Sequence, residues 1–110
     1  MIERNMMASS DAIALMVSRL SLALQPNRII LFGSHGRGTA GPESDVDLLI
    51  VMDHVDDTRK AMVAAMRIVS DIPIPKDIIV TDSQRLTTRS KMQHTIEAAA
   101  MREGREIYVA

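Results

Sequence analysis

The sequence has no cysteine and no tryptophan, and its aromatic side chains are one phenylalanine and one tyrosine. Without cysteine the chain can form neither disulfide bonds nor thiolate zinc sites, which agrees with a reducing, cytoplasmic setting. Two aromatic rings offer little surface on which the bases of single-stranded nucleic acid could stack. The formal net charge of −1 gives no basic field. We therefore expect no general binding to nucleic acid.

Long apolar runs are also missing from the sequence. No stretch is long enough to span a bilayer, and no charged segment followed by an apolar one opens the chain as in a secretory signal. These two absences predict a cytoplasmic protein that does not associate with membranes. The length of 110 residues fits one compact domain, so we expect residues 1–110 to form a single domain.

Apolar residues at helical spacing predict a first helix that begins near Ser9 and ends before Pro26. A second helix is predicted after Asp56 and a third over residues 91–103, with Gly104 in the left-handed position that follows a helix. Short apolar segments predict strands, at residues 28–32, 47–52, 77–81 and 107–109.

This alternation of strands and helices predicts an α/β fold, with helices packed on a small sheet. Only about a dozen residues separate the first two strands, which is cramped for the crossover helix that a parallel pair needs. The sheet is therefore expected to be mixed rather than purely parallel.

The stretch from Leu31 to Val51, LFGSHGRGTAGPESDVDLLIV, joins the first two predicted strands through a glycine-rich turn. Gly36, Gly38 and Gly41 match the dinucleotide fingerprint G-x-G-x-x-G, but that fingerprint must open a long helix, whereas here a proline and a strand follow. A P-loop needs a lysine at the position of Gly38. Neither of these two phosphate-binding designs therefore applies.

A third design fits the residues around the glycines. Gly33 and Ser34 end the first predicted strand, where their backbone N–H groups can hold an anion at the start of a short helix. Asp45 and Asp47 project to the same side of an extended chain because side chains alternate along a strand. Two such carboxylates repel each other unless a cation lies between them, and hard oxygen ligands favour Mg²⁺ or Mn²⁺.

Two aspartates compete for the role of a third carboxylate. Asp77 opens the third predicted strand, and Asp82 stands five residues further on. The alternation of side chains places them on opposite faces of that strand but favours neither. The residues alone leave the choice between Asp77 and Asp82 open.

The pair Gly33-Ser34, followed by Ser44-Asp45-Val46-Asp47-Leu48, resembles the signature of the DNA polymerase β-like nucleotidyltransferase superfamily. More narrowly, the chain is similar to the minimal, MNT-type nucleotidyltransferases of bacteria and archaea over nearly its whole length. In that family Arg and Ala often follow the GS pair. His35 and Gly36 stand there instead, which puts phosphate contacts at these two positions in doubt.

The resemblance implies a polymerase β-like nucleotidyltransferase fold and a metal-dependent transfer of a nucleoside monophosphate, AMP from ATP, to an acceptor hydroxyl. Two Mg²⁺ ions, or Mn²⁺, would bind to carboxylates, and the family pattern favours Asp77 as the third. The implied ligands and catalytic residues are Asp45, Asp47 and Asp77. The implied nucleotide-binding residues are Gly33, Ser34 and Arg37. Arg37 is equally well explained as a solvated turn arginine.

The resemblance also implies a partner. MNT-type proteins commonly pair with a helical HEPN-type toxin and act as its antitoxin, in studied members by adding AMP to a tyrosine of the toxin. One alternative is an antitoxin that acts by binding alone, and another is a transferase that acts on a small molecule or an RNA end. The sequence leaves open the acceptor, the nucleotide base and the oligomeric state, including a homo-oligomer.

Overall fold

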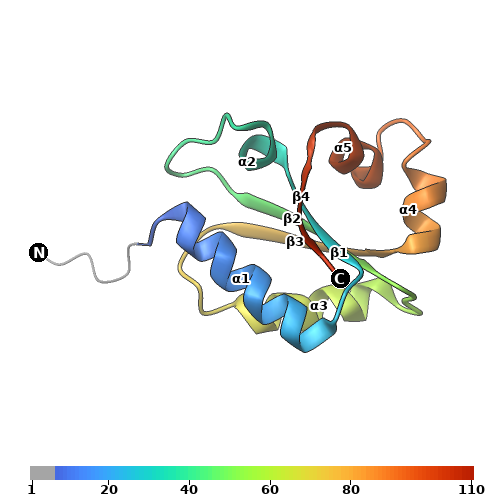
Figure 1. Cartoon of the computed structure of the whole chain (residues 1–110), viewed down its shortest axis with the longest axis horizontal. Helices are drawn as coiled ribbons and strands as arrows, with labels where there is room; N and C mark the ends of the chain where they lie inside the picture. Colours follow the sequence, from blue (N-terminus) through green and yellow to red (C-terminus); the bar gives the residue numbers. More distant parts are fainter. Residues whose placement is uncertain (1–6) are drawn as a thin grey trace, which may run out of the picture.

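The computed structural model describes residues 7–110, in which helices and strands alternate except for two successive helices before the last strand (Figure 1). The predicted α/β order is confirmed, and so is each predicted strand. The elements are α1 (Ser9–Leu24), β1 (Arg28–Phe32), α2 (Gly33–Arg37), β2 (Val46–Met52), α3 (Thr58–Val69), β3 (Lys76–Asp82), α4 (Ser83–Arg89), α5 (Ile96–Glu103) and β4 (Arg105–Val109).

The four strands form one sheet in the order β3-β2-β1-β4. β1 pairs with β2 and with β4 in antiparallel fashion, whereas β2 and β3 are parallel. The short connection from β1 to β2 therefore needs no crossover, and α3 provides the crossover between the parallel strands. The predicted mixed sheet is confirmed.

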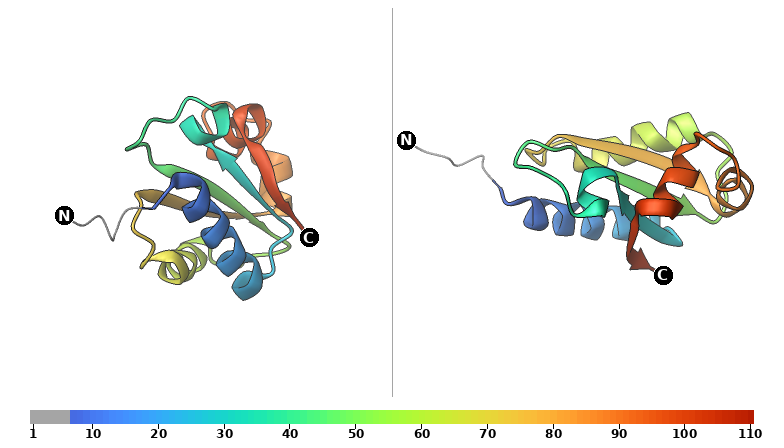
Figure 2. Two further views of the ribbon diagram at one scale, coloured as in Figure 1. Left: turned by 60° about the vertical axis from the view of Figure 1, so that its left-hand side comes forward. Right: turned by 90° about the horizontal axis from the view of Figure 1, so that it is seen from above.

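Helices cover both faces of the sheet (Figures 1 and 2). Leu48 and Ile50 of β2 belong to a core with α1 and α3, whereas Leu49 and Val51 belong to a second core with α4 and α5. This division follows from the alternation of side chains along a strand. The odd-numbered positions of β2, Asp47 among them, thus face the side of the sheet that carries α4 and α5.

The third predicted helix is shorter than expected. Residues 91–103 were expected to be helical throughout, but α5 begins only at Ile96, and the side chain of Met92 is 47% exposed in the preceding turn. Thr95 precedes the helix, and its hydroxyl accepts a hydrogen bond from the backbone N–H of Ala98 at 3.0 Å. This cap fixes the start of the helix at a point that hydrophobic spacing alone does not reveal.

Gly104 ends α5 for a different reason from the predicted one. Its φ of −86° is not left-handed, so the cap conformation does not require glycine. A Cβ at this position would instead collide with the carbonyl oxygen of Ala100 and would lie 2.6 Å from Cγ2 of Ile30. Close packing of the helix end on β1 is therefore what favours glycine here.

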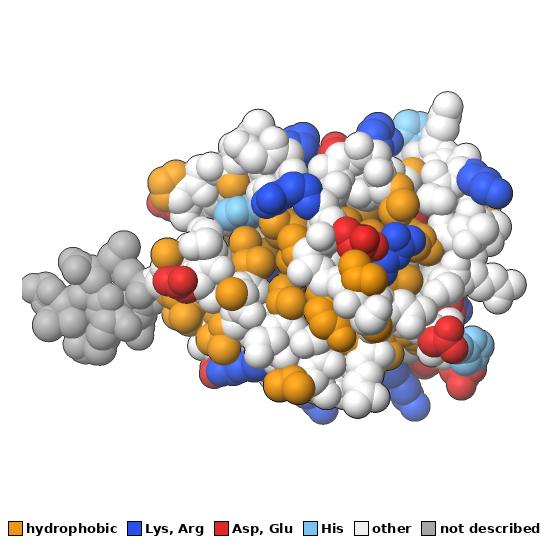
Figure 3. Space-filling model, in the orientation of Figure 1, with side chains coloured by type: hydrophobic (Ala, Val, Ile, Leu, Met, Phe, Trp, Pro, Cys, Tyr) orange, Lys and Arg blue, Asp and Glu red, His pale blue; other side chains and the backbone are white. Residues whose placement is uncertain are grey.

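On the face seen in Figure 3, hydrophobic side chains gather near the middle beside one neighbouring acidic and basic pair, and further charged side chains of both signs are scattered around them. This face shows no large basic patch, in line with the nearly neutral composition. Within residues 7–110, no helix is both long and apolar enough to cross a membrane.

Candidate active site

The turn after β1 forms the first part of the site. Gly33 has a φ of +65°, a left-handed conformation that glycine adopts at little cost, and it turns the chain directly from the strand into α2. The single turn of α2 ends at Gly38, with φ +78°. The backbone N–H of Thr39 donates to the carbonyl of Ser34 at 2.9 Å and closes the turn. The predicted short helix after the GS pair is thus present.

Gly33 lies directly against the carboxylate of Asp47. A Cβ on Gly33 would collide with Oδ2 of Asp47 and would lie 3.1 Å from its Cγ. The antiparallel register explains the contact, because Phe32, the residue before Gly33, is the partner of Asp47 across β1 and β2. The GS turn and the first strand carboxylate therefore meet at one point.

Asp77 lies beside Asp47 in the parallel register of β2 and β3. Partners across adjacent strands face the same side of the sheet, and adjacent strands are about 4.8 Å apart. Asp45 directly precedes β2. Burial raises the pKa of Asp47, as do the negative charges of Asp77 and then Asp45, while His35 and Arg37 oppose the shift only in part.

The three carboxylates, Asp45, Asp47 and Asp77, have no hydrogen-bond or ion-pair partner in the described part of the chain. No three Asp, Glu or His side chains come close enough together there to hold a metal ion by themselves. Mg²⁺ commonly binds one or two carboxylates together with phosphates of the substrate and water, rather than an all-protein cage. These side chains fit a cation that binds together with a nucleotide.

Asp82 lies at the other end of β3, and its surroundings are different. It is 3% exposed, and its carboxylate accepts hydrogen bonds from the backbone N–H of Val55 at 3.1 Å and of Arg85 at 2.9 Å. Nη1 of Arg85 adds an ion pair at 2.7 Å. The backbone N–H of Arg85 contributes most to a lowered pKa of Asp82. Of the two candidates for a third carboxylate, Asp77 lies beside Asp47, whereas the carboxylate of Asp82 is fully engaged in hydrogen bonds and an ion pair.

Comparison with known protein families gives a match over most of the chain. The model of the nucleotidyltransferase domain family matches residues 13–106. The chain belongs to this nucleotidyltransferase family. The predicted polymerase β-like fold and the minimal nucleotidyltransferase type are thereby confirmed.

Among curated proteins, none matches this nucleotidyltransferase significantly. A solved structure described as a toxin-antitoxin with AMP-PNP is similar in fold, with a TM-score of 0.60 and 16% identity, over 94% of this chain and 75% of that one. A second, a protein from Sulfolobus solfataricus provisionally described as a nucleotidyltransferase and solved at 1.40 Å, gives a TM-score of 0.49 and 21% identity over 94% of this chain and 92% of that one.

Arg37, predicted to contact phosphate, lies at the end of α2 in this nucleotidyltransferase. Its Nη1 donates to Oε1 of Glu103 on α5 at 2.9 Å, and its side chain is 47% exposed. Sequence reasoning missed Glu103, because nothing in the local pattern connects residues 66 positions apart. Only the packing of α5 beside α2 brings them together.

His35 and Gly36, the two departures from the family pattern, each make a contact that explains the residue type. Nε2 of His35 lies 3.3 Å from the carbonyl oxygen of Ser44 and so contacts the loop that leads to Asp45. Gly36 is buried, and a Cβ there would lie 2.6 Å from the carbonyl oxygen of Leu31. His35 thus contacts the loop before the carboxylates, and Gly36 allows α2 to pack against the end of β1.

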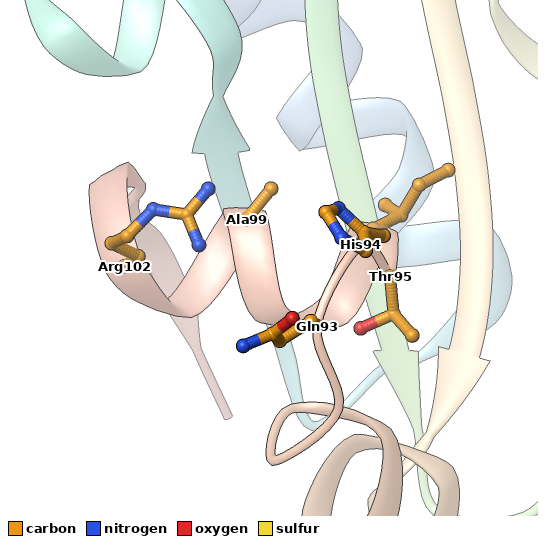
Figure 4. Close-up of a pocket in the computed structure, with 6 residues that line it drawn as sticks. Gln93, His94, Thr95, Ala99 and Arg102 are labelled. Atoms are coloured by element: carbon orange, nitrogen blue, oxygen red, sulfur yellow. The ribbon is translucent and has the colours of Figure 1, made fainter.

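An open cavity of about 580 Å³ lies beside α5 (Figure 4). It is lined by Gln93, His94, Thr95, Ile96, Ala99 and Arg102. No carboxylate is among these lining residues, so the cavity lacks the hard oxygen ligands that a magnesium site needs. The candidate active site is therefore the region around Gly33, Asp47 and Asp77.

Proposed function

We propose that this nucleotidyltransferase transfers AMP from ATP to an acceptor hydroxyl at the site formed by Gly33, Asp45, Asp47 and Asp77. One observation carries the proposal, namely the contact of the GS turn with a strand carboxylate that has a second carboxylate beside it in register. A phosphate-binding turn and a cation site must be adjacent for a triphosphate to bind both. The contact of Gly33 with Asp47 supports the proposal for this reason.

In the proposed reaction, the oxygen of the acceptor hydroxyl attacks the α-phosphorus of ATP. The bond from that phosphorus to the oxygen bridging to the β-phosphate breaks, and pyrophosphate leaves with the electron pair. Asp77, which is exposed at the start of β3, takes the hydroxyl proton. Gly33 and Ser34 bind the β- and γ-phosphates through backbone N–H groups and the serine hydroxyl, and Arg37 adds a further phosphate contact. Such reactions depend mainly on alignment and charge neutralisation.

Two Mg²⁺ ions, or Mn²⁺, are part of the proposal, and the donor set fits them. Asp45, Asp47 and Asp77 would hold the ions, which would neutralise charge on the attacking and leaving oxygens. The support is the raised pKa of Asp47, caused by burial and by the neighbouring carboxylates, because a cation removes that cost. Hard carboxylate oxygens are ligands that these ions prefer.

For the acceptor, we propose a hydroxyl on a HEPN-type toxin, for which this protein is the antitoxin. Two findings support this choice over a small molecule. The resemblance to MNT-type proteins points to such a partner, and the similar fold in a structure described as a toxin-antitoxin with AMP-PNP agrees with it. The net charge of −1 counts against an RNA acceptor.

The test is incubation with the protein encoded next to this one, Mg²⁺, and ATP labelled at the α-phosphate. Asp47→Asn is the test variant. Asp53→Asn is the matched control, because Asp53 is an exposed aspartate just beyond the end of β2. We expect label on the partner with the wild type and the control, and almost none with Asp47→Asn or with chelator.

The same three proteins, tested also for relief of the partner's toxicity, separate the alternatives. If all three proteins neutralise the toxin and none labels it, the protein is an antitoxin that acts by binding alone. If label appears on a small molecule or an RNA end and never on the partner, the transfer chemistry stands and the proposed acceptor is wrong. Absence of any labelled product, with toxicity unrelieved, would contradict the whole proposal.

A further inference from the structure

The helices α2 and α5 lie side by side in the three views of the molecule (Figures 1 and 2), although they are far apart in the sequence. The ion pair between Arg37 and Glu103 joins them at 2.9 Å. The helices are also close at Gly36, where a Cβ would lie 3.4 Å from the carbonyl oxygen of Glu103, an ordinary van der Waals distance. The end of α5 is thus packed directly against the helix that follows the GS turn.

α5 is itself firmly attached to the rest of the fold. Glu97 near its start is 6% exposed and accepts a hydrogen bond from the hydroxyl of Thr81 on β3 at 2.8 Å. Nε of Arg89 on α4 donates to the same carboxylate at 3.1 Å. A buried carboxylate with two partners fixes the position of this helix. The carboxylate of Glu103 is therefore presented from a fixed element and not from a mobile loop.

The Arg37–Glu103 pair leaves much of the arginine free to bind a ligand. A guanidinium has five N–H donors in a rigid plane, and the bond to Glu103 uses Nη1. The side chain of Arg37 is 47% exposed, whereas that of Glu103 is 25% exposed. Glu103 therefore restrains one edge of the guanidinium, and within the described residues the other donors form no hydrogen bond.

We propose that Glu103 is a positioning residue that holds the guanidinium of Arg37 in place to bind the triphosphate. This inference rests on the proposed function, since it needs a nucleotide beside α2. A long arginine side chain loses rotamer freedom when it binds phosphate, and a carboxylate that restrains it beforehand reduces that loss. The negative charge of Glu103 acts in the opposite sense, because it repels phosphate. The restraint must outweigh the repulsion for the proposal to hold, so the sign of the effect tests it.

The experiment measures the Kd of α,β-methylene ATP with Mg²⁺, an analogue whose bond between the α- and β-phosphates cannot be cleaved by transfer. Glu103→Ala is the test variant. Glu106→Ala is the matched control, because Glu106 pairs with Arg28 at the same distance of 2.9 Å but on β4, outside the site. Glu103→Gln, which keeps a hydrogen-bond acceptor, is the conservative variant.

We expect Glu103→Ala to raise the Kd about two- to fivefold, the range for exposed ion pairs. Glu103→Gln should give a smaller rise, and Glu106→Ala should match the wild type. In the background of Arg37→Ala, the further change Glu103→Ala should no longer raise the Kd, because the arginine through which the restraint acts is gone and only the repulsion of phosphate is removed. With ATP labelled at the α-phosphate and the acceptor protein, the KM for ATP should rise and kcat should stay within about twofold, because the ground and transition states lose the same restraint.

Two kinds of result overturn the inference, and they differ in meaning. If the wild type binds the analogue and Glu103→Ala binds it equally well or more tightly, Glu103 does not position Arg37. An equal loss in Glu106→Ala, or an undiminished effect of Glu103→Ala without Arg37, would equally rule out that role. If the wild type does not bind the analogue at all, the proposed function itself fails and the inference fails with it.

Discussion

The two ends of the parallel pair β2–β3 both carry aspartate, but the surroundings of the aspartates are opposite in kind. At the amino ends, Asp47 and Asp77 lie side by side without a hydrogen-bond or ion-pair partner in the described residues. At the carboxyl end, Asp82 is buried, accepts two backbone hydrogen bonds and forms an ion pair with Arg85. The pKa of Asp47 is raised by burial and like charges, and that of Asp82 is lowered, chiefly by the Arg85 backbone N–H.

This difference separates a carboxylate that we propose to be functional, Asp47, from one that stabilises the fold, Asp82. Asp82 joins the loop at Val55 to the start of α4, so its charge stabilises the folded state. The charge of Asp47 works against the folded state until something positive compensates it. Groups with perturbed pKa values and no structural partner are candidates for functional sites, whereas a fully bonded carboxylate has a sufficient structural explanation.

The largest expected effect is on activity. Asp47→Asn should reduce the rate of nucleotidyl transfer at least about 100-fold, because it removes a carboxylate that holds the metal ions in the proposed reaction. The measurement is the initial rate of label transfer at saturating ATP, with Asp53→Asn as the control. A rate within threefold of the wild type, a difference of about 0.7 kcal/mol in activation free energy, would show that the active site does not lie at the amino ends of these strands.

The next largest effect is on stability and concerns Asp82 at the carboxyl end of β3. Asp82→Asn should lower the free energy of unfolding by about 2 kcal/mol, because the buried acceptor loses its charge and its pairing with Arg85. Urea unfolding at neutral pH measures the change. Asp77→Asn is the control on the same strand and should leave stability unchanged or slightly higher. Equal losses in the two variants would show that the two ends do not differ.

Comparing alanine variants of two glycines, Gly33 and Gly38, tests the contact between the GS turn and the carboxylate of Asp47. Gly33 and Gly38 both have positive φ, so alanine should cost each about 1–2 kcal/mol of backbone strain. A Cβ on Gly33 would also collide with Asp47, whereas within the described residues nothing lies within 4 Å of a Cβ on Gly38. Gly33→Ala should therefore be the less stable variant by thermal unfolding, and its transfer rate should fall more. Equal behaviour would mean that Gly33 does not pack against the carboxylate.

The smallest effect is the pH dependence of stability, which should have opposite signs at the two aspartates. The folded pKa of Asp82 is lowered, so its contribution is complete above the ordinary Asp pKa of about 3.9 and is lost as pH falls through the folded value. The folded pKa of Asp47 is raised, so ionised Asp47 destabilises the fold at higher pH, and protonation relieves this as pH falls through the folded value.

Urea unfolding across acid pH checks both signs. The loss caused by Asp82→Asn should shrink as the solution becomes more acidic. The stability gained by Asp47→Asn should also shrink, but at higher pH, because the raised pKa of Asp47 lies above the lowered pKa of Asp82. If Asp47→Asn did not raise the free energy of unfolding at neutral pH, burial and the neighbouring carboxylates would not destabilise the charge of Asp47.

Much of the fold could be predicted from the sequence because local signals were strong. Strands such as β1 are short apolar runs between turn residues, and α1 has clear helical spacing, so both appear where expected. The short β1–β2 connection correctly indicated a mixed sheet. The start of α5 was missed because Thr95 caps the helix within a segment that is otherwise compatible with helix.

The candidate site was predicted in part, and its remainder depends on tertiary contacts. The spacing of the GS pair and the two following aspartates indicated one site, and the structure brings Gly33 to Asp47. The choice between Asp77 and Asp82 needed the strand register, which alternation along one strand cannot supply. The partner of Arg37 could not be foreseen, because Glu103 reaches it only through the packing of two helices.

The central claim is that the amino ends of β2 and β3 hold carboxylates together at a cost to stability so that a cation can bind. The most direct test compares the free energy of unfolding of the wild type and Asp47→Asn, first in chelator and then with Mg²⁺ and α,β-methylene ATP. We predict that the variant is the more stable protein in chelator, and that the ligands stabilise the wild type by about 2.7 kcal/mol at 100 times their Kd and the variant much less. A variant that is less stable in chelator, or equally stabilised by the ligands, would contradict the claim.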